Sequence, residues 1–338
     1  MARTAVVVGG GIGGLTTAAR LRAAGWDVRV LERADSLPDT GTALGLWPAA
    51  MAALDAIGIG DEARLHARRQ GTARLLRPDG SRIASLTRAD PVWLLSRPPL
   101  LRLLHKAVGD VEFGVSVPDV RDLRDYDLVV ASDGLNSAAR GVLFGDTYRP
   151  SYAGATAWRG TVDGDTADFT ETWGEGARFG ITPQEGNRAN WYACVLAPER
   201  QRSPGGEADA VRRHFGHWHG GIQRVLAGIS EDTVVRNDLY YLRRPLPSYV
   251  DGRVALIGDA AHAMTPDLGR GACEAMVDGV TLADAVATFG VDAGLRRYDK
   301  FRRGRTQRMV RASLLVNRLA HARRFTTLRD RLLGIAIR

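Results

Sequence analysis

The first 32 residues hold the feature that most constrains the fold: an apolar strand, a glycine-rich turn, a helix and a second strand. Residues 4–8 (TAVVV) are apolar and β-branched, as in a buried strand. They run into a glycine pattern, after which residues 15–25 have helical spacing and end at a glycine. Residues 27–31 (DVRVL) predict a second strand, which Glu32 follows. This order predicts a Rossmann-type unit with parallel strands.

The GxGxxG glycines, Gly9, Gly11 and Gly14, each have a physical task in such a unit. Gly9 allows a tight turn, Gly11 lets the backbone approach a pyrophosphate, and Gly14 lets helix and strand pack closely. The helix N-terminus near Ile12 offers free N–H groups and about half a positive charge. Glu32, 23 positions after Gly9, can accept hydrogen bonds from ribose hydroxyls and would repel a 2′-phosphate. The unit therefore predicts binding of FAD or NAD.

Two later stretches also deliver an aspartate from the end of an apolar strand. Residues 126–131 predict a strand that leads into Asp133, Gly134 and a helix capped by Ser137. The stretch 254–278 runs from an apolar strand through Asp259 and a loop of small residues to a helix that opens near Gly269. Each stretch alone is compatible with an ordinary Asp-Gly turn or loop.

The middle of the chain predicts a different kind of structure. Residues 151–200 show alternation and turn glycines, which favour an antiparallel sheet rich in tryptophan, with Trp158, Trp173 and Trp191. We expect the remaining elements to be a hairpin at 73–86, a short helix at 48–58, a helix from Leu100, a strand at 111–115, a helix at 207–227, a strand at 233–241 and a long basic helix at 294–320.

Composition narrows the class of protein. The net charge of +8 is carried almost entirely by scattered arginines, so we do not predict a nucleic-acid partner. The chain contains no apolar run of the roughly 20 residues that span a bilayer, and its start shows no leader pattern. Two cysteines suggest a reducing cytoplasm. The histidines at 214, 217 and 219 have no carboxylate or cysteine partner on a matching face, so no metal site is expected.

The ordered set of three motifs resembles the single-component FAD-dependent aromatic monooxygenases, the para-hydroxybenzoate hydroxylase-like group. The resemblance covers nearly the whole chain. It implies an α/β fold in which a Rossmann-type FAD-binding domain is interleaved with an antiparallel-sheet substrate domain and followed by a long C-terminal helix. The implied FAD-binding domain comprises 1–70, 97–150 and 250–290, the substrate domain 71–96 and 151–249, and the C-terminal helical region 291–338.

The resemblance also implies site residues. Gly9, Gly11, Ile12, Gly14 and Glu32 would hold the ADP half of FAD. The other residues implied to contact FAD are Arg33 near the adenine, Gly45, Arg97, Asp133, Asp259 at the ribityl chain, and Pro266, Gly269, Arg270 and Gly271 around the isoalloxazine. Glutamine is usual in the family where this chain has Arg270, and we predict that the Arg270 side chain points away from the flavin.

The implied reaction is hydroxylation of an electron-rich aromatic or polycyclic compound of secondary metabolism. NAD(P)H and O2 are the implied co-substrates, and the reaction would pass through C4a-hydroperoxyflavin. Arg159 on the substrate sheet could stabilise a phenolate, and a surface role for it is equally compatible with the sequence. The alternatives are epoxidation, Baeyer–Villiger oxygenation, or a scaffold protein without catalysis. No WxWxIP stretch is present, which argues against a flavin halogenase. A monomer or a homodimer fits the sequence.

Overall fold

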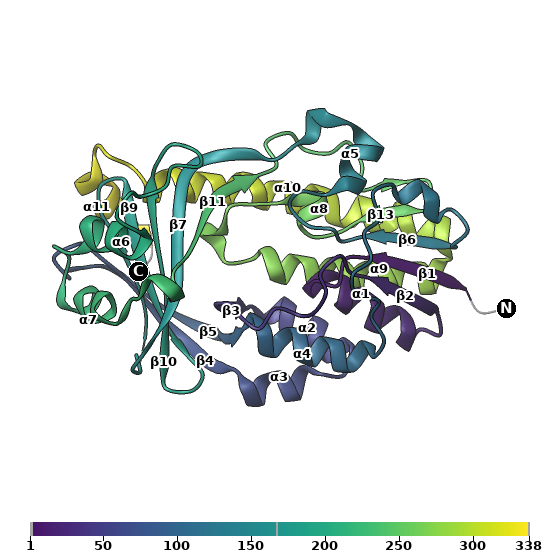
Figure 1. The fold of residues 1–338 in the computed structure, drawn as a ribbon, viewed down its shortest axis with the longest axis horizontal. Coiled ribbons are helices and arrows are strands. Elements are labelled where there is room, and N and C mark those ends of the chain that lie inside the picture. Colours follow the sequence, from purple (N-terminus) through teal and green to yellow (C-terminus); the bar gives the residue numbers. More distant parts are fainter. Residues whose placement is uncertain (1–2, 167, 337–338) are drawn as a thin grey trace.

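A computed structural model describes residues 3–166 and 168–336 of the chain. Two sheets lie at opposite ends of an elongated molecule, and helix α10 runs along both (Figure 1). The helices are α1 (Ile12–Ala23), α2 (Pro48–Ala56), α3 (Gly60–His66), α4 (Arg97–Val108), α5 (Ala138–Phe144), α6 (Glu207–Phe215), α7 (Gly220–Gly228), α8 (Asp259–His262), α9 (Gly271–Phe289), α10 (Val291–Ala320) and α11 (Thr326–Ala336).

The smaller sheet has the predicted Rossmann-type core. Its order is β12 (Val250–Asp251), β13 (Val254–Leu256), β6 (Leu128–Ala131), β1 (Thr4–Val8) and β2 (Asp27–Leu31). β1 pairs in parallel with β2 and β6, and β6 pairs in parallel with β13. The carboxyl ends of these strands therefore meet at one edge, which is where open α/β sheets bind their ligands.

The larger sheet is antiparallel apart from the β4–β8 pair. Its order is β11 (Val235–Tyr241), β7 (Ser151–Asp163), β10 (Arg188–Leu196), β9 (Ala177–Gln184), β8 (Phe169–Trp173), β4 (Arg68–Leu76), β5 (Arg82–Ser96) and β3 (Ala43–Leu46). β3 lies within the range predicted for the FAD-binding domain, yet it pairs with β5 of this sheet. The chain thus crosses between the sheets more often than the sequence suggested.

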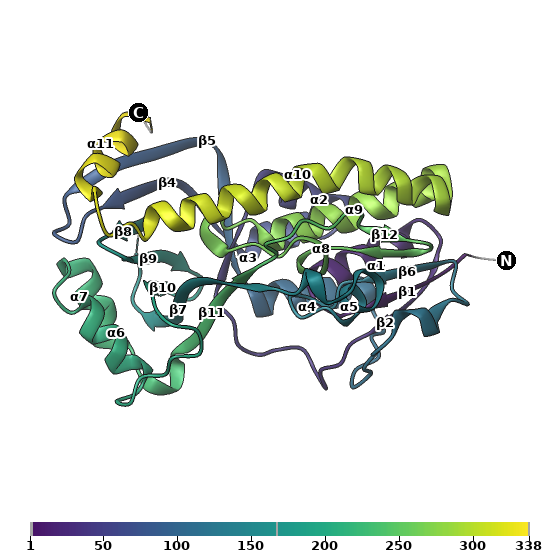
Figure 2. The same cartoon turned by 90° about the horizontal axis from the view of Figure 1, so that it is seen from above.

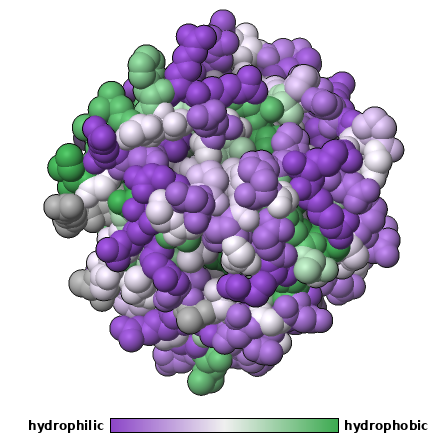
Figure 3. Space-filling view, turned by 90° about the vertical axis from the view of Figure 1, so that its left-hand side faces the viewer, coloured by the Kyte–Doolittle hydropathy of each residue, from purple (hydrophilic) through white to green (hydrophobic). Residues whose placement is uncertain are grey.

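Helix α10 connects the two ends of the molecule. Its 30 residues pack on α9 beside the smaller sheet and extend to the larger one (Figure 2). Helix α11 then covers part of β5 at that far end, which Figure 3 views directly. Among the described residues, no helix combines the length and apolar character needed to cross a bilayer.

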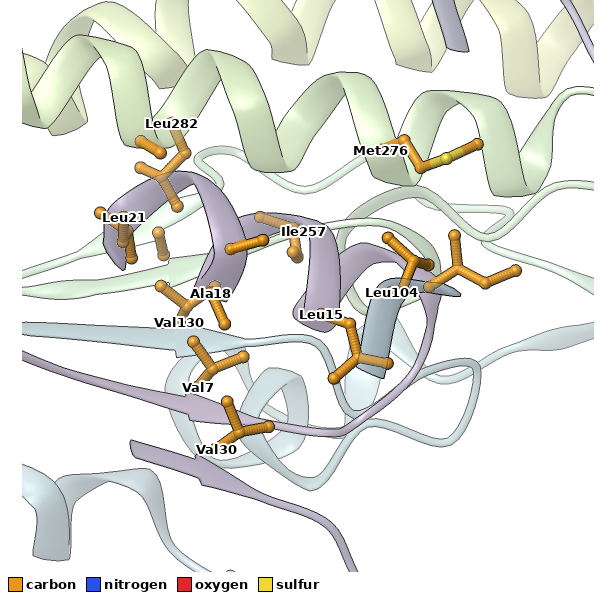
Figure 4. Packing of buried hydrophobic residues seen from close by; sticks show 14 of the residues in the cluster. Val7, Leu15, Ala18, Leu21, Val30, Leu104, Val130, Ile257, Met276 and Leu282 are labelled. Carbon is orange, nitrogen blue, oxygen red and sulfur yellow. The ribbon is translucent and has the colours of Figure 1, made fainter. Parts of the chain in front are cut away.

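The main core lies between the smaller sheet and its helices. Figure 4 shows Leu15 and Leu21 of α1 between the sheet valines, among them Val7 and Val130, and Leu282 of α9. These side chains are at most 1% exposed. Burying each large apolar side chain contributes roughly 1.5–3 kcal/mol, so this core fixes α1 and the turn before it against the sheet.

Two sequence predictions about elements were wrong. Residues 111–115 were expected to form a strand, but they make only one parallel bridge, between Glu112 and Leu31. The helix expected at 207–227 is two helices, because Gly216 and the following residues break it and His219 caps α7 by accepting a hydrogen bond from Gly221 N. The sequence interpretation also did not identify α3 or α11.

Candidate FAD site

The turn between β1 and α1 has the geometry that its glycines predict. Gly9 has φ +108°, and a Cβ there would lie 2.5 Å from the Ser132 carbonyl oxygen. A Cβ on Gly14 would lie 2.0 Å from the Gly9 carbonyl oxygen, so helix and strand touch at this point. A Cβ on Gly11 would meet no atom within 4 Å. The first two glycines are needed for packing, whereas Gly11 faces open space at the start of α1.

Glu32 ends β2 beside this turn. Its Oε2 accepts a hydrogen bond from Gly10 N at 2.6 Å, and its Oε1 accepts one from Ala34 N at 2.8 Å. These backbone donors fix the carboxylate at the carboxyl edge of the sheet. The remaining lone pairs of the two oxygens are available to ribose hydroxyls.

One cleft, with a volume of about 460 Å³, gathers most of the predicted site residues. The predicted residues that line it are Gly9, Gly11, Ile12, Glu32, Arg33, Arg97, Asp133, Asp259 and Gly271. The predicted residues that do not line it are Gly14, Gly45, Arg159, Pro266, Gly269 and Arg270. The three sequence motifs therefore meet at one place in the fold.

The sequence interpretation missed one wall of the cleft, formed by residues 115–118. This segment follows the single bridge at Glu112, and Val115 N donates to the Glu32 carbonyl oxygen at 2.9 Å. It therefore runs beside the end of β2 without extending the sheet. The short apolar pattern suggested a strand, and no local signal showed that the segment borders the cleft.

Asp259 follows Gly258, whose φ is +57°. The Asp259 side chain lines the cleft and is exposed there, and the protein around it removes part of its hydration. This desolvation raises the pKa of Asp259, although His262, Arg97 and Arg140 oppose the shift. A carboxylate at the wall of this cleft can accept a hydrogen bond from a hydroxyl of a bound ligand.

Arg140 holds the second and third motifs together. Its guanidinium donates to the carbonyl oxygens of Leu135 (2.6 Å), Tyr148 (2.9 Å) and Ala260 (3.0 Å). Burial lowers the pKa of Arg140, and Asp133 and Asp259 partly offset this effect. Asp133 Oδ2 in turn accepts from Ala139 N at 3.0 Å. Arg140 was visible in the motif, but only the structure shows that it connects α5 to α8.

A buried charge network fixes the third motif against α9 and α10. Asp278 Oδ1 accepts from Arg302 Nε at 2.6 Å, and Asp278 Oδ2 lies 2.5 Å from His262 Nε2. Arg302 also pairs with Glu274 at 2.6 Å. Burial by itself would raise the pKa of Asp278, but His262 and Arg302 outweigh it and lower that pKa. His262 is therefore a structural partner within this network.

Arg270 joins the outer end of this network. It donates to Glu274 Oε1 from Nε at 3.2 Å and from Nη2 at 2.9 Å, and its guanidinium lies 5.3 Å from the Trp47 ring centroid. The side chain does not line the cleft, whereas the next residue, Gly271, does. That the Arg270 side chain points away from the flavin therefore stays a prediction.

The larger sheet presents a polar face toward the cleft. Asn190 Oδ1 accepts from Ala43 N at 3.3 Å, and Arg178 pairs with Asp267 of the short turn Pro266–Leu268 at 2.8 Å. Arg159 lies on this face and donates to Asn237 Oδ1. Desolvation lowers the pKa of Arg159, and the like charge of nearby Arg97 lowers it further.

The tryptophans do not form this face. Trp158 and Trp191 alternate to the opposite side, where they pack with Phe215 and Trp218 under α6 and α7. Trp173 lies near α11, where Arg329 is 5.4 Å from its ring centroid. The predicted antiparallel sheet is confirmed, and its tryptophan-bearing face packs in the core while the polar face lies opposite.

The fold and the cleft together define a flavoprotein of the monooxygenase type. A family model described as "FAD binding domain" matches residues 2–124 and 125–313, and the chain belongs to that family. Aurachin C monooxygenase/isomerase from Stigmatella aurantiaca is 32% identical, over 94% of this chain and 89% of its own. The 3-amino-4-hydroxybenzoate 2-monooxygenase of Streptomyces cremeus is 33% identical, over 90% and 84%.

A solved structure agrees closely with this fold. The crystal structure of Klebsiella pneumoniae HpxO in complex with FAD and uric acid superposes with a TM-score of 0.90 and 27% identity, covering 98% of this chain and 93% of that one. The relatives are FAD-dependent aromatic hydroxylases and monooxygenases, and the expected cofactor, FAD, is confirmed. The chain is an FAD-dependent monooxygenase of this group.

Proposed function

We propose that the protein uses NAD(P)H and O2 to hydroxylate an electron-rich aromatic or polycyclic small molecule, and that it does so in the cytoplasm. The observation that supports this most strongly is the meeting of three motifs at one cleft beside a polar sheet face. The relatives named above act on small aromatic compounds, or are bound to one, which supports the substrate class.

In this proposal the β1–α1 turn and Glu32 hold the ADP half of FAD, with Arg33 near the adenine. The unpaired N–H groups at the start of α1 suit the pyrophosphate, since Gly11 leaves the backbone open to it. Arg97 supplies positive charge at the same cleft, and Asp133 borders it. These residues bind the cofactor and carry no proton in the reaction.

The flavin end of the site is formed by Asp259 and the N-terminus of α9. Asp259 is placed to accept a ribityl hydroxyl, and Gly271 begins the 19-residue helix α9. The partial positive charge of that helix end would stabilise negative charge on the flavin pyrimidine. Pro266 and Gly269 shape the loop before the helix, where Gly269 has φ +59°. Bound FAD, when reduced by NAD(P)H, supplies the chemistry of oxygen activation.

Arg159 is the residue that we assign to the substrate. Its guanidinium lies on the polar face, and among the described residues it donates to the Asn237 amide and pairs with no carboxylate. A guanidinium there would stabilise an anionic ring oxygen by a charge-assisted contact. Such an anion is also more electron-rich and reacts faster with an electrophilic oxygen.

Flavin reduction tests the proposal. The purified protein should take up FAD and turn yellow, and NAD(P)H should bleach it without oxygen, faster when the correct phenolic or polycyclic compound is present. Comparison of NADH with NADPH decides the co-substrate. Failure to take up FAD would contradict the cofactor assignment, and FAD uptake without bleaching would identify a scaffold.

Two measurements extend this test. Analysis of the oxygenated product separates hydroxylation from epoxidation and Baeyer–Villiger oxygenation. Arg159→Met should raise KM for an anionic substrate by roughly ten- to a hundredfold, because a charge-assisted contact is lost, with FAD affinity unchanged. Arg74→Met is the matched control, because Arg74, on β4 of the same sheet, already pairs with a carboxylate, that of Asp168.

A further inference from the structure

Helix α11 has an orientation opposite to that of an ordinary surface helix, which turns its apolar side toward the core. Its polar side chains Arg329 and Asp330 are buried, being 8% and 5% exposed. Three of its large apolar side chains, together with the residue before the helix, are 55% to 80% exposed and are spaced three or four apart, while Leu333 is half-buried. These form the apolar stripe: Phe325, Leu328, Leu332 and Ile335.

Buried polar anchors fix this orientation. Asp330 accepts from Arg77 Nε at 2.9 Å, and Arg329 donates to the carbonyl oxygens of Gly174 (3.3 Å) and Ala320 (3.4 Å). Turning the stripe inward would break the Arg77–Asp330 pair and leave the Gly174 and Ala320 carbonyl oxygens without their Arg329 donor, which is unfavourable. The outward stripe is therefore a defined feature of the folded protein.

The exposed apolar surface continues onto the end of α10. Leu315 and Leu319 are 59% and 41% exposed and are one helical turn apart. Figure 2 shows α11 at the end of α10, and Figure 3 shows apolar side chains gathered along one margin of this end of the molecule. A contiguous apolar surface rimmed by polar groups marks an interaction site.

The rim of this surface is basic. Between Phe301 and Ala336 the only acidic residue is the buried Asp330. Within the described residues no ion pair involves the exposed arginines between Phe301 and Ala336. These are Arg305, Arg308, Arg311, Arg318, Arg323, Arg324 and Arg331. Leucine and phenylalanine flanked by arginine are typical of a helix that lies in the interface of an anionic membrane.

We propose that α11 and the end of α10 bind the surface of an anionic lipid bilayer, with the apolar stripe in the headgroup region and the arginines on lipid phosphates. A second copy of the chain fits this surface less well, because a twofold contact would bring arginine against arginine. A bilayer surface supplies both the apolar depth and the negative charge. The binding does not depend on which reaction the site performs.

Vesicle flotation of the FAD-loaded protein tests this inference. The protein should float with phosphatidylglycerol-containing vesicles at least tenfold more than with phosphatidylcholine vesicles, since each arginine adds attraction to anionic lipid. Raising the salt from about 0.1 M to about 0.5 M should reduce this binding, because screening shortens the range of the attraction. Binding that is absent, or equal on both kinds of vesicle, would overturn the proposal.

Variants identify the surface. Replacing Leu328, Leu332 and Ile335 together by serine should reduce vesicle binding roughly tenfold or more, because the buried apolar area is lost. The FAD absorbance should not change, since these side chains face solvent. Leu65→Ser is the matched control, because Leu65 is 84% exposed on α3. An equal loss of vesicle binding in Leu65→Ser would refute the assignment of binding to the apolar stripe. A concentration-dependent dimer that the triple variant abolishes would identify the stripe as an interface between two copies of the chain instead.

Discussion

Alanine substitutions at Gly14 and Gly11 should separate the packing role of Gly14 from the cofactor-binding role of Gly11. A methyl group at Gly14 would lie 2.0 Å from the Gly9 carbonyl oxygen and 2.4 Å from Ser132 Oγ. Backbone must therefore move, and overpacking of this kind costs about 1–3 kcal/mol. Alanine regains up to about 1 kcal/mol of helix propensity. We expect Gly14→Ala to lower the free energy of unfolding by about 1–2 kcal/mol.

Gly11→Ala should behave differently. Gly11 has φ −78° and ψ −179°, which any residue adopts, and no atom lies within 4 Å of its Cβ position. The free energy of unfolding of the FAD-free protein should fall by no more than about 1 kcal/mol, the cost of alanine at a helix N-cap. The Kd for FAD should rise at least about tenfold, equivalent to 1.4 kcal/mol, because the methyl group occupies space assigned to the pyrophosphate.

Urea unfolding followed by tryptophan fluorescence measures the first quantity, and quenching of FAD fluorescence on titration measures the second. The m-value should be the same for both variants, which shows that the same surface unfolds. Unchanged FAD affinity in Gly11→Ala would refute the assignment of the open side of the turn to the pyrophosphate. Equal loss of stability in both variants would refute the packing argument.

Three further changes test the network and the C-terminal region. Arg302→Met should lower the free energy of unfolding by about 3–5 kcal/mol, because buried carboxylates lose their partner, and urea unfolding measures this. Wild-type stability should also fall as the pH drops below 3.8, the ordinary pKa of Asp. The pKa of Asp278 is lowered in the folded protein, so the unfolded chain binds the proton more readily. The urea midpoint should therefore fall less steeply with pH in Arg302→Met than in the wild type. Arg270→Gln should leave the flavin potential and the Kd for FAD unchanged, and a shift in either would show that the side chain acts on the cofactor. Burial and the charge of a neighbouring arginine lower the pKa of His321 from 6.5 to about 4, so its neutral form contributes stability above pH 6.5 that is lost toward pH 4, in total about 3 kcal/mol. His321→Phe should flatten that dependence in urea unfolding, and an unchanged pH dependence would contradict the assignment to His321.

The sequence predicted the elements whose signals are local. The first strand, turn and helix follow from apolar residues and glycines within 20 positions, and Ser137 caps α5 by accepting from Arg140 N at 2.9 Å, as expected. Local signals failed where an apolar run resembles a strand but finds no strand to pair with along its length. Residues 111–115 look like a strand, but only Glu112 finds a partner on Leu31.

The sequence predicted the separate motifs of the candidate site, but it did not predict the contacts that hold these motifs together. Arg140 lies 120 positions from Ala260, to which it donates, and Arg302 lies 24 positions from Asp278. Neither contact has a signature in local spacing, because each depends on how separate helices pack. Arg270 was a departure from the family pattern, and its pairing with Glu274 on the next helical turn explains how the arginine is accommodated.

The sequence by itself determined that the chain has a dinucleotide-binding turn, an antiparallel sheet and three motifs that belong to one flavin site. These features depend on short-range sterics and periodicity, which are properties of neighbouring residues and do not depend on the rest of the fold. Tertiary structure alone decided which face of the larger sheet meets the cleft and which side of α11 meets solvent. Alternation and helical spacing show that a strand or helix has two different sides. Which side is buried depends on the elements that pack against it, and these are far away in the chain.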